Sequence, residues 1–350
     1  MPNNVTSPLS IEYAQIKRKR LALLLAMLVA MITSLMLDIS TGPANIGFFE
    51  LLQGLVDPDS LEMRYRIILW DVRLPDALIA ISVGAALGLA GAETQTVLNN
   101  PLASPYTLGV SALAALGASL AIVIHPSIPE LSDRVVLPMM ALMFALLGGF
   151  LILAFTRMTD GSREHVILFG IALVFFANAM TAGLQYVASA EAVQEIVFWT
   201  IGNLTKAGWP EFFVVTLAFL IVFPFSLRHV WAMTLIRAGE SHAVSSGLNV
   251  RRMRTWVILR ISVLAAFAVC FVGTIGFIGL VGPHIARLLL GEDHRFLIPG
   301  SVLCGALLLS TASVLSKALL PGVIIPVGIV TAMIGVPVFL VLIIQQRHRL

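Results

Sequence analysis

A short polar stretch between two long apolar runs, residues 228–254, contains the side chains best suited to a contact with a partner. Its basic residues are Arg228, Arg237, Arg251, Arg252 and Arg254. Glu240 and Ala243 are three residues apart, so they share one face of a helix. Gly247 supplies a natural helix end, because glycine tolerates a positive φ. The pattern predicts a short helix that is either presented to a partner or is a solvated connector.

Other kinds of chemistry have little support in the sequence. There is no H-E-x-x-H motif for zinc, no phosphate-binding G-x-x-x-x-G-K-[ST] loop, and no Ser and His pair at a convincing depth. His284 follows Pro283 near the end of an apolar run, where a hydrogen-bonded structural role is favoured over metal ligation. Cys270 and Cys304 both lie inside apolar runs, which favours packing over a disulfide. The sequence therefore predicts no catalytic residues, no metal and no cofactor.

The composition is that of a polytopic membrane protein. Of the 350 residues, 58% are hydrophobic and only 12% are charged, whereas soluble domains carry about 25% charged residues. The apolar runs are long and continuous, so they favour spanning helices over a barrel. The net charge of +3 is accounted for by topology and does not indicate nucleic-acid binding. No cleaved signal peptide is expected, because the first apolar run lacks a clear small-x-small site.

The hydrophobic pattern predicts an all-α fold with ten spanning helices. The expected spans are 21–37, 74–93, 108–124, 135–155, 166–187, 212–227, 256–272, 275–290, 297–315 and 327–344. Residues 1–16 are expected to form a loose tail, and residues 41–66 are too polar to span. Residues 191–210 are amphipathic and contain two Trp residues, which is typical of an interfacial helix. We expect a tail at 1–20 and one permease domain at 21–350, with its cytoplasmic loop at 228–255.

The distribution of charge predicts the orientation. With ten spans, fifteen of the 22 basic residues fall on the side of the two termini. By the positive-inside rule, both termini and the 228–255 loop are cytoplasmic. The central thirds of the spans show no ionisable residue, since Asp76 and Glu93 fall at opposite ends of the second span and Arg260 falls near the cytoplasmic end of the seventh. Ion coupling therefore has no evident machinery, and energy supplied by a separate subunit is favoured.

Three long motifs resemble one family. They are RLP at 73–75 followed by GAALGLAGAETQTVLNNPLASPYTLGV at 84–110, then GTIGFIGLVGPHIARLLLGEDHR at 273–295 and PVGIVTAMIGVPVF at 326–339. In this order they resemble the FecCD-type permeases of ABC importers for iron siderophores, haem and cobalamin. The resemblance covers nearly the whole chain after about residue 60. It implies a type II importer fold, a second permease copy, two ATPase subunits and an external substrate-binding protein.

The resemblance also gives candidate site residues. The loop between the sixth and seventh spans matches the family's ATPase-docking helix, and the matching residues are Gly239, Glu240, Ala243, Gly247 and Leu248. A structural role is expected for Asn99 and for the motif residues Asn100, Pro101, Pro105, Gly109, Pro283 and Arg287, with Arg287 placed near the ATPase. The translocation path is expected to use small and apolar residues of the fifth span, together with Asn178 and Gln185.

The chain departs from the family pattern on its outer face. The family has Arg-Leu-Pro-Arg, but here Arg73 is kept and Asp76 replaces the second Arg. Ser313 and Lys317 stand where the family tends to have Asp and Arg, and Ile324 replaces a usual Glu. We expect Arg73 and Lys317 to be exposed cations that contact the binding protein, with an altered docking surface on that partner.

The sequence as a whole predicts the permease subunit of an ABC importer, most consistent with a ferric siderophore as cargo. The ATPase would be a separate subunit, membrane lipid would surround the chain, and the location would be the bacterial inner membrane. Haem and cobalamin stay open as cargo within the family. An ion-coupled secondary transporter is the alternative from another class, and a scaffold without transport activity is a third.

Overall fold

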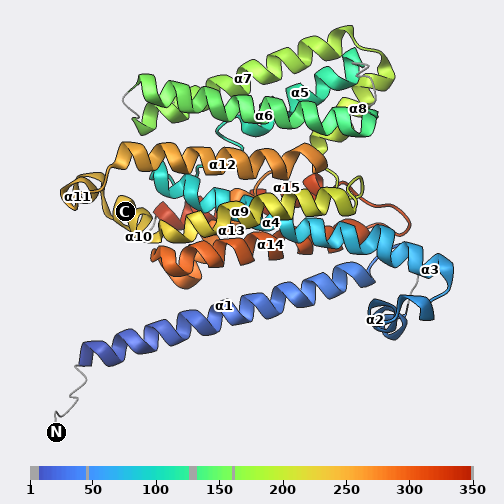
Figure 1. Ribbon diagram of the computed structural model, residues 1–350, viewed down its shortest axis with the longest axis horizontal. Coiled ribbons are helices and arrows are strands. Elements are labelled where there is room, and N and C mark those ends of the chain that lie inside the picture. Colours follow the sequence, from blue (N-terminus) through green and yellow to red (C-terminus); the bar gives the residue numbers. More distant parts are fainter. Residues whose placement is uncertain (1–7, 45–46, 126–131, 160–161, 348–350) are drawn as a thin grey trace.

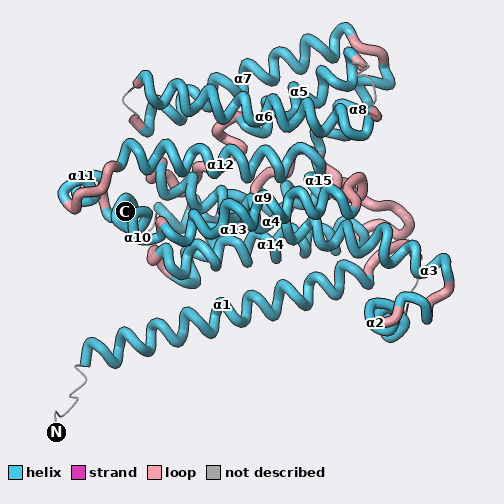
Figure 2. Tube along the Cα trace, in the orientation of Figure 1, coloured by secondary structure: helices cyan, strands magenta, loops and turns pink. Residues whose placement is uncertain are grey.

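The computed structural model describes residues 8–44, 47–125, 132–159 and 162–347. Within these ranges the chain forms helices and no extended strand (Figures 1 and 2). The longer helices are α1 (Pro8–Ser40), α4 (Leu74–Val97), α5 (Val110–Ile124), α6 (Asp133–Met158), α7 (Arg163–Val187), α8 (Ala190–Ile201), α9 (Trp209–Arg228), α12 (Val250–Val272), α13 (Ile278–Leu290), α14 (His294–Ala318) and α15 (Val327–Arg347). The all-α prediction is confirmed.

The ten predicted spans all appear as helices. Seven helices are long and apolar enough to cross a membrane, and α5, α13 and the apolar part of α15 are three shorter apolar helices. The polar segment before α4 forms α2 (Phe48–Val56), a 3-10 turn (Pro58–Ser60), α3 (Met63–Ile67) and a π-helical stretch (Ile68–Arg73). In lipid each backbone N–H and C=O must be satisfied within the protein, which is why the spans are helical throughout.

The starts of α1 and of the helix that contains α4 differ most from the sequence prediction. Helix α1 already begins at Pro8, so much of the tail expected to be loose is helical. The second span is extended at its start, because α3 and the π-helical stretch lead into α4 without a break. Pro75 does not stop this helix, because the turn directly before it is π-helical and Arg73 and Leu74 keep helical backbone angles.

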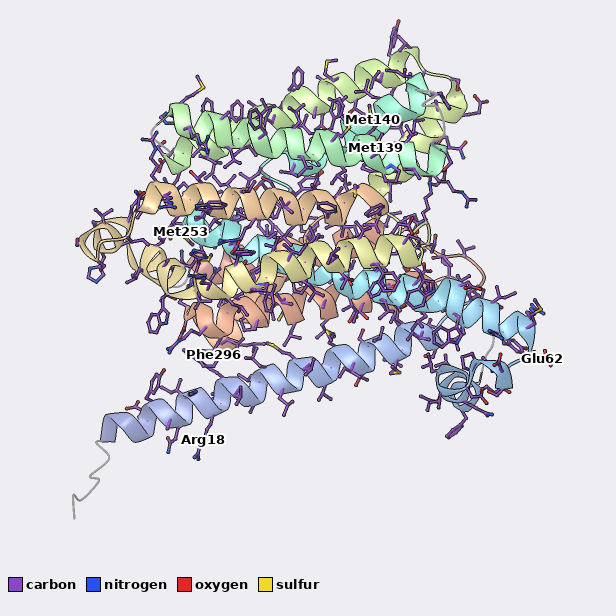
Figure 3. All side chains as sticks on the ribbon, viewed as in Figure 1. Arg18, Glu62, Met139, Met140, Met253 and Phe296 are labelled. Atoms are coloured by element: carbon purple, nitrogen blue, oxygen red, sulfur yellow. The ribbon has the colours of Figure 1, made fainter. Side chains whose placement is uncertain are left out.

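Helix α4 forms the centre of the fold, with α9, α12, α13 and α14 packed around it. Helices α5 to α8 form a group beyond α12, and α1 lies on the opposite side along α14 (Figure 1). Helix α11 (Glu240–Ser245), the start of α1 and the end of α15 lie at one end of the molecule, while α2 and α3 lie at the other. Arg18 and Glu62 mark these opposite ends in Figure 3.

Glycines allow the central helices to touch backbone to backbone. A Cβ added at Gly84 would lie 2.4 Å from the carbonyl oxygen of Gly305, and one at Gly88 would lie 2.2 Å from that of Ser301. A Cβ at Gly91 would lie 1.8 Å from the carbonyl oxygen of Gly279. The small residues of α4 therefore allow its backbone to contact the backbones of α13 and α14, as small residues do between membrane helices.

This contact leads to a first stability prediction. Gly84→Ala should lower the free energy of unfolding by about 1–3 kcal/mol, the usual cost of overpacking, because α14 offers only backbone at that point and cannot give way. Gly183→Ala in α7 is the matched control, since an added Cβ there meets nothing within 4 Å. Thermal unfolding of both purified variants in one detergent checks the prediction, and equal midpoints for the two would contradict it.

Candidate functional site

The predicted polar helix is present and lies at one end of the helix bundle. Helix α9 is followed by α10 (Val230–Ala238), by α11 (Glu240–Ser245) and then by α12. A single residue, Gly239, separates α10 from α11, and its φ is +139°. A side chain there would strain the backbone, because L residues rarely adopt this conformation. The chain can therefore turn sharply between α10 and α11 at this glycine.

Helix α11 ends in a Schellman motif. The N–H of Gly247 donates to the carbonyl of Val244 at 2.9 Å, and the N–H of Leu248 donates to the carbonyl of Ala243 at 3.0 Å. Gly247 has a φ of +83°, the left-handed conformation that this motif requires. The helix end that the sequence predicts at Gly247 is therefore observed, and the two bonds fix where the chain leaves α11.

One face of α11 points into the protein and the other is open. Ala243 is fully buried, whereas Ser241, His242 and Val244 are exposed. Val244 is 58% exposed although it is apolar. Of the residues matched to the family's docking helix, Ala243 therefore packs against this chain, and the neighbouring Ser241, His242 and Val244 form the exposed face of α11.

Glu240 anchors α11 to two other helices. Its Oε2 atom accepts hydrogen bonds from Arg163 at the start of α7, at 2.6 Å from Nη2 and 3.2 Å from Nε. The same oxygen accepts one from Nη2 of Arg254 in α12 at 3.2 Å. The hydrogen bonds from Arg163, with the charge of Arg254, hold the pKa of the Glu240 carboxyl below its ordinary value of 4.5. Sequence reasoning missed this anchor, because its partners are remote along the chain.

The lowered pKa gives a prediction with a definite sign. Because the folded-state pKa lies below 4.5, the anchor contributes fully above that pH and is lost as the pH falls through the folded-state pKa. A nitroxide on Ser245, in the otherwise unchanged permease in vesicles, should therefore be immobile near neutral pH and become mobile only below pH 4.5. Glu240→Gln is the control, since it should give a mobile label without that transition. A transition unchanged in Glu240→Gln would contradict the assignment.

The motif between α4 and α5 is built from local turns. Asn99 has a φ of +46°, and the N–H groups of Asn99 and Asn100 donate to the carbonyls of Thr96 and Gln95, so α4 also ends in a Schellman motif. The side chain of Asn100 accepts from the N–H of Leu102 at 2.9 Å. These bonds give the asparagines and the following Pro101 a turn-forming role, which is the role that their composition favours.

The remaining motif residues also lie in packed positions. Gly109 precedes α5 with a φ of +85°, and a Cβ there would lie 3.0 Å from the Cβ of Leu173. Pro105 and Pro283 are buried. Arg287 donates to Oε1 of Gln95 at 2.9 Å, so it bonds within this chain.

Asn178 and Gln185 lie on α7, far along the helix from the anchor residue at its start. Asn178 is exposed and Gln185 is half-buried. They are seven residues apart, which places them on one side of the helix. The structure therefore puts them on a surface of the single subunit and does not bring them together with the residues of α11.

The two cations that the sequence places on the outer face, Arg73 and Lys317, are located differently from the prediction. Arg73 is only 4% exposed and donates to the backbone carbonyls of Ile39, Ser40 and Ala44. Lys317 is bonded to Asp38 at 2.8 Å, with side chains 5% and 0% exposed. The prediction that these two cations are exposed is wrong in the single subunit, because both hold the C-terminal end of α1 against the bundle. Contact with a binding protein stays a prediction.

The spans also contain a buried ion pair. Nη2 of Arg260 lies 2.8 Å from Oε1 of Glu93, and Nε lies 3.1 and 3.2 Å from the two carboxylate oxygens. Their side chains are 8% and 0% exposed. Glu93 lies four residues before the end of α4, and Nη1 of Arg260 lies 3.5 Å from Nδ1 of His229 directly after α9, so the pair is level with the ends of these two helices, as expected from the sequence. The two charges compensate each other, so the pair joins α4 to α12.

Within the described ranges, seven helices long and apolar enough to cross a membrane, three shorter apolar helices and a short polar helix anchored at one end of the bundle define a polytopic membrane protein. In the described residues no group of three or more His, Cys, Asp or Glu side chains could hold a metal ion. The chain belongs to the FecCD transport family, whose model matches residues 27–345. Permeases of this family are membrane transport subunits rather than enzymes, and the ATPase is a separate subunit.

Individual relatives support the same assignment. The hemin transport system permease protein HmuU of Yersinia pestis is 34% identical, over 90% of this chain and 94% of its own length. The Fe(3+)-citrate import system permease protein YfmE of Bacillus subtilis is 36% identical, over 93% and 95%. A solved chain from an ABC transporter described as of the metal-chelate type, in an inward-facing conformation, matches with a TM-score of 0.81 and 28% identity. It covers 93% of this chain and 99% of its own.

Proposed function

We propose that this permease imports a ferric chelate, with a siderophore as the best-fitting cargo, by alternating access driven by separate ATPase subunits. The observation that carries the mechanism is the anchoring of α11, whose Glu240 is bonded to both α7 and α12. A short helix fixed in this way passes a displacement to two long helices at once. Cargo in the family's range is supported by the relatives named for hemin and Fe(3+)-citrate. Haem and cobalamin are the alternatives.

The proposed assembly contains two copies of a permease, two ATPase subunits and an external binding protein. The exposed face of α11 would be seated in a cleft of the ATPase, while Glu240 and Ala243 hold its other face to the permease. The backbone at Gly239 and the Schellman motif at Gly247 and Leu248 would set its direction. ATP-driven closure of the ATPases would then move α11 together with α7 and α12.

The proposed orientation places α11 and both termini in the cytoplasm of a bacterial cell, with the chain in the inner membrane. The support is that the start of α1, the end of α15 and α11 lie at one end of the bundle (Figure 1), and that this end carries most of the basic residues. The binding protein would approach the opposite end. Asn178 and Gln185, on the surface of α7, are proposed to face the path between the two permease copies.

The experiment is transport by the reconstituted complex. The permease is purified with its co-expressed ATPase and binding protein and placed in vesicles. Uptake of radiolabelled ferric citrate, a ferric trihydroxamate, haemin and cobalamin is then measured with and without ATP. The proposal expects ATP-dependent uptake of a ferric chelate. Uptake that continues without the ATPase and is abolished by an uncoupler would favour an ion-coupled transporter. Uptake of haemin alone or cobalamin alone would identify that compound as the cargo in place of a ferric chelate.

A further inference from the structure

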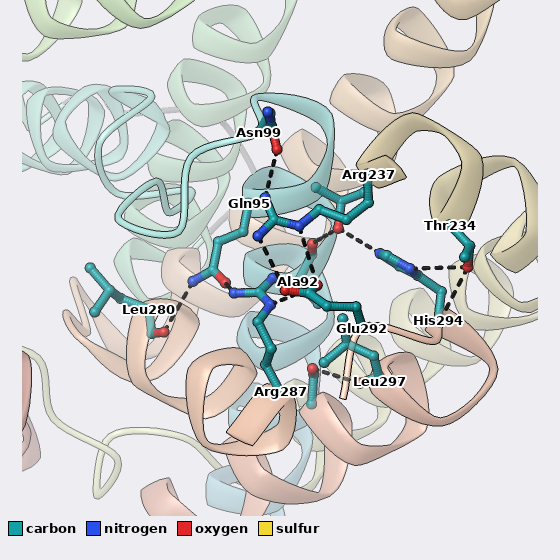
Figure 4. A network of polar contacts seen from close by, with 12 residues as sticks. Ala92, Gln95, Asn99, Thr234, Arg237, Leu280, Arg287, Glu292, His294 and Leu297 are labelled. Carbon is teal, nitrogen blue, oxygen red and sulfur yellow. Dashed lines mark hydrogen bonds and ion pairs between the residues drawn. The ribbon is translucent and has the colours of Figure 1, made fainter. Parts of the chain in front are cut away.

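A second polar network connects α10, the helix that precedes α11, to the inner ends of α4 and α13 (Figure 4). Its centre is Glu292, in the short loop between α13 and α14. Nη2 of Arg237 lies 3.1 Å from Oε1 of Glu292, and Nε lies 3.2 Å from Oε2. Nε of Arg287 donates to the same Oε2 at 3.1 Å. One carboxylate thus joins an arginine of α10 to an arginine of α13.

Arg287 extends the network to the last turn of α4, and Arg237 extends it to the turn that follows α4. Nη1 of Arg237 donates to the side-chain oxygen of Asn99 at 2.6 Å. Nη1 of Arg287 donates to Oε1 of Gln95 at 2.9 Å, and the amide of Gln95 donates to the carbonyl of Leu280 at 3.1 Å. The bonds therefore form a closed circuit through α10, α4 and α13. A closed circuit resists relative movement of its members better than one isolated pair does.

A parallel connection lies one turn earlier on α10. The hydroxyl of Thr234 lies 3.2 Å from Nδ1 of His294, and Nε2 of His294 lies 2.7 Å from the hydroxyl of Thr96 in α4. Thr234 and Arg237 are three residues apart and so lie on one face of α10. On that face, Thr234 is connected through His294 to Thr96 in α4, and Arg237 is bonded to Glu292 and to Asn99.

The charges show why Glu292 matters most in this network. The side chains of Arg237 and Arg287 are 24% and 11% exposed, and Glu292 is the acidic residue paired with both. Without its carboxylate, two poorly solvated guanidinium groups would face each other. The Glu292 side chain is 48% exposed, so water screens part of the repulsion between the two guanidinium groups, and the rest weakens the contact between α10 and α13.

We propose that Glu292 is a positioning residue that makes α10 and the inner ends of α4 and α13 move as one body when α11 is displaced. This inference rests on the proposed function, because it assigns the path by which the ATPase displaces these helices. Glu240 bonds α11 to α7 and α12, and the Glu292 network bonds α10 to α4 and α13. The segment 228–254 would therefore be bonded to both groups of helices.

The test compares Glu292→Gln with Asp293→Asn in the reconstituted complex. Asp293 is the matched control, because it is adjacent in the same loop but is paired with Arg295 and Arg20. In Glu292→Gln we expect ATP hydrolysis to continue, while uptake of ferric citrate or ferric trihydroxamate per ATP falls about tenfold, the factor for one lost charge-assisted hydrogen bond. Wild-type coupling in Glu292→Gln, an equal loss in both variants, or a parallel loss of hydrolysis would overturn the assignment.

A second measurement does not depend on that variant assembling. Spin labels on Ala238 of α10 and on Leu289 of α13, both exposed, report the distance between the two helices in the otherwise wild-type complex. The assignment expects one distance in the nucleotide-free and ATP-trapped states, and a distance that changes between the states would overturn it. Failure of the proposed function would appear differently, as hydrolysis and uptake that are unlinked in the wild-type complex.

Discussion

The double variant Glu240→Arg with Gly247→Pro is expected to insert in the membrane and to lose uptake, down to the level of vesicles without the ATPase. The arginine would place a third guanidinium beside Arg163 and Arg254, which now share the Glu240 carboxylate. Proline cannot adopt the φ of +83° at position 247, and it lacks the N–H that donates to Val244. Both changes act on α11 and on its attachment to the starts of α7 and α12, and leave the apolar packing of the spans unchanged.

The control is Glu164→Arg, which makes the same change of charge on an exposed neighbour of Arg163. It should retain uptake, since its side chain has no hydrogen bond or ion pair in the described part of the structure. Membrane insertion of each variant is checked by its yield in the detergent extract. Transport at the wild-type rate by the double variant would remove the coupling role of α11.

Glu93→Ala should be the most destabilising single substitution of those considered. It would leave the buried Arg260 without its carboxylate partner, and breaking a buried pair in this way costs about 3–5 kcal/mol. Replacing both residues, with Glu93→Met and Arg260→Met, should recover most of the loss, because neither charge is then buried alone. The free energy of unfolding, from denaturant titrations followed by circular dichroism, checks both expectations.

An exposed pair provides the comparison for the buried one. Arg66 and Asp59 are bonded, but their side chains are 51% and 82% exposed. Asp59→Ala should therefore cost less than about 1 kcal/mol. If the double Met variant were no more stable than Glu93→Ala, or if Asp59→Ala cost as much as Glu93→Ala, burial of the pair would not be the source of the stability.

The sequence predicted those features whose signal is local. The ten helices follow from the length of the apolar runs, and the close approach of α4 to its neighbours follows from its small residues. The short helix at Glu240 and its end at Gly247 follow from the spacing of a few residues. In each case the residues that determine the structure lie within one or two turns of each other.

The features that the sequence did not predict depend on partners far away in the chain. Glu93 and Arg260 are 167 residues apart, and Glu240 and Arg163 are 77 apart. A signal for the first pair was present, because single opposite charges at the same end of two apolar runs tend to pair in membranes. The burial of Lys317 had no such signal, since its partner Asp38 lies on α1, and the sequence does not say which helices pack together.

The most direct test of the central claim is a photo-crosslinker at Val244, on the exposed side of α11, in the assembled complex. The account predicts an adduct with the ATPase subunit, because the side chain of Val244 is 58% exposed on the helix that is proposed to receive the ATPase. An adduct with the external binding protein, or none with the ATPase in a complex that hydrolyses ATP and transports its cargo, would contradict the account.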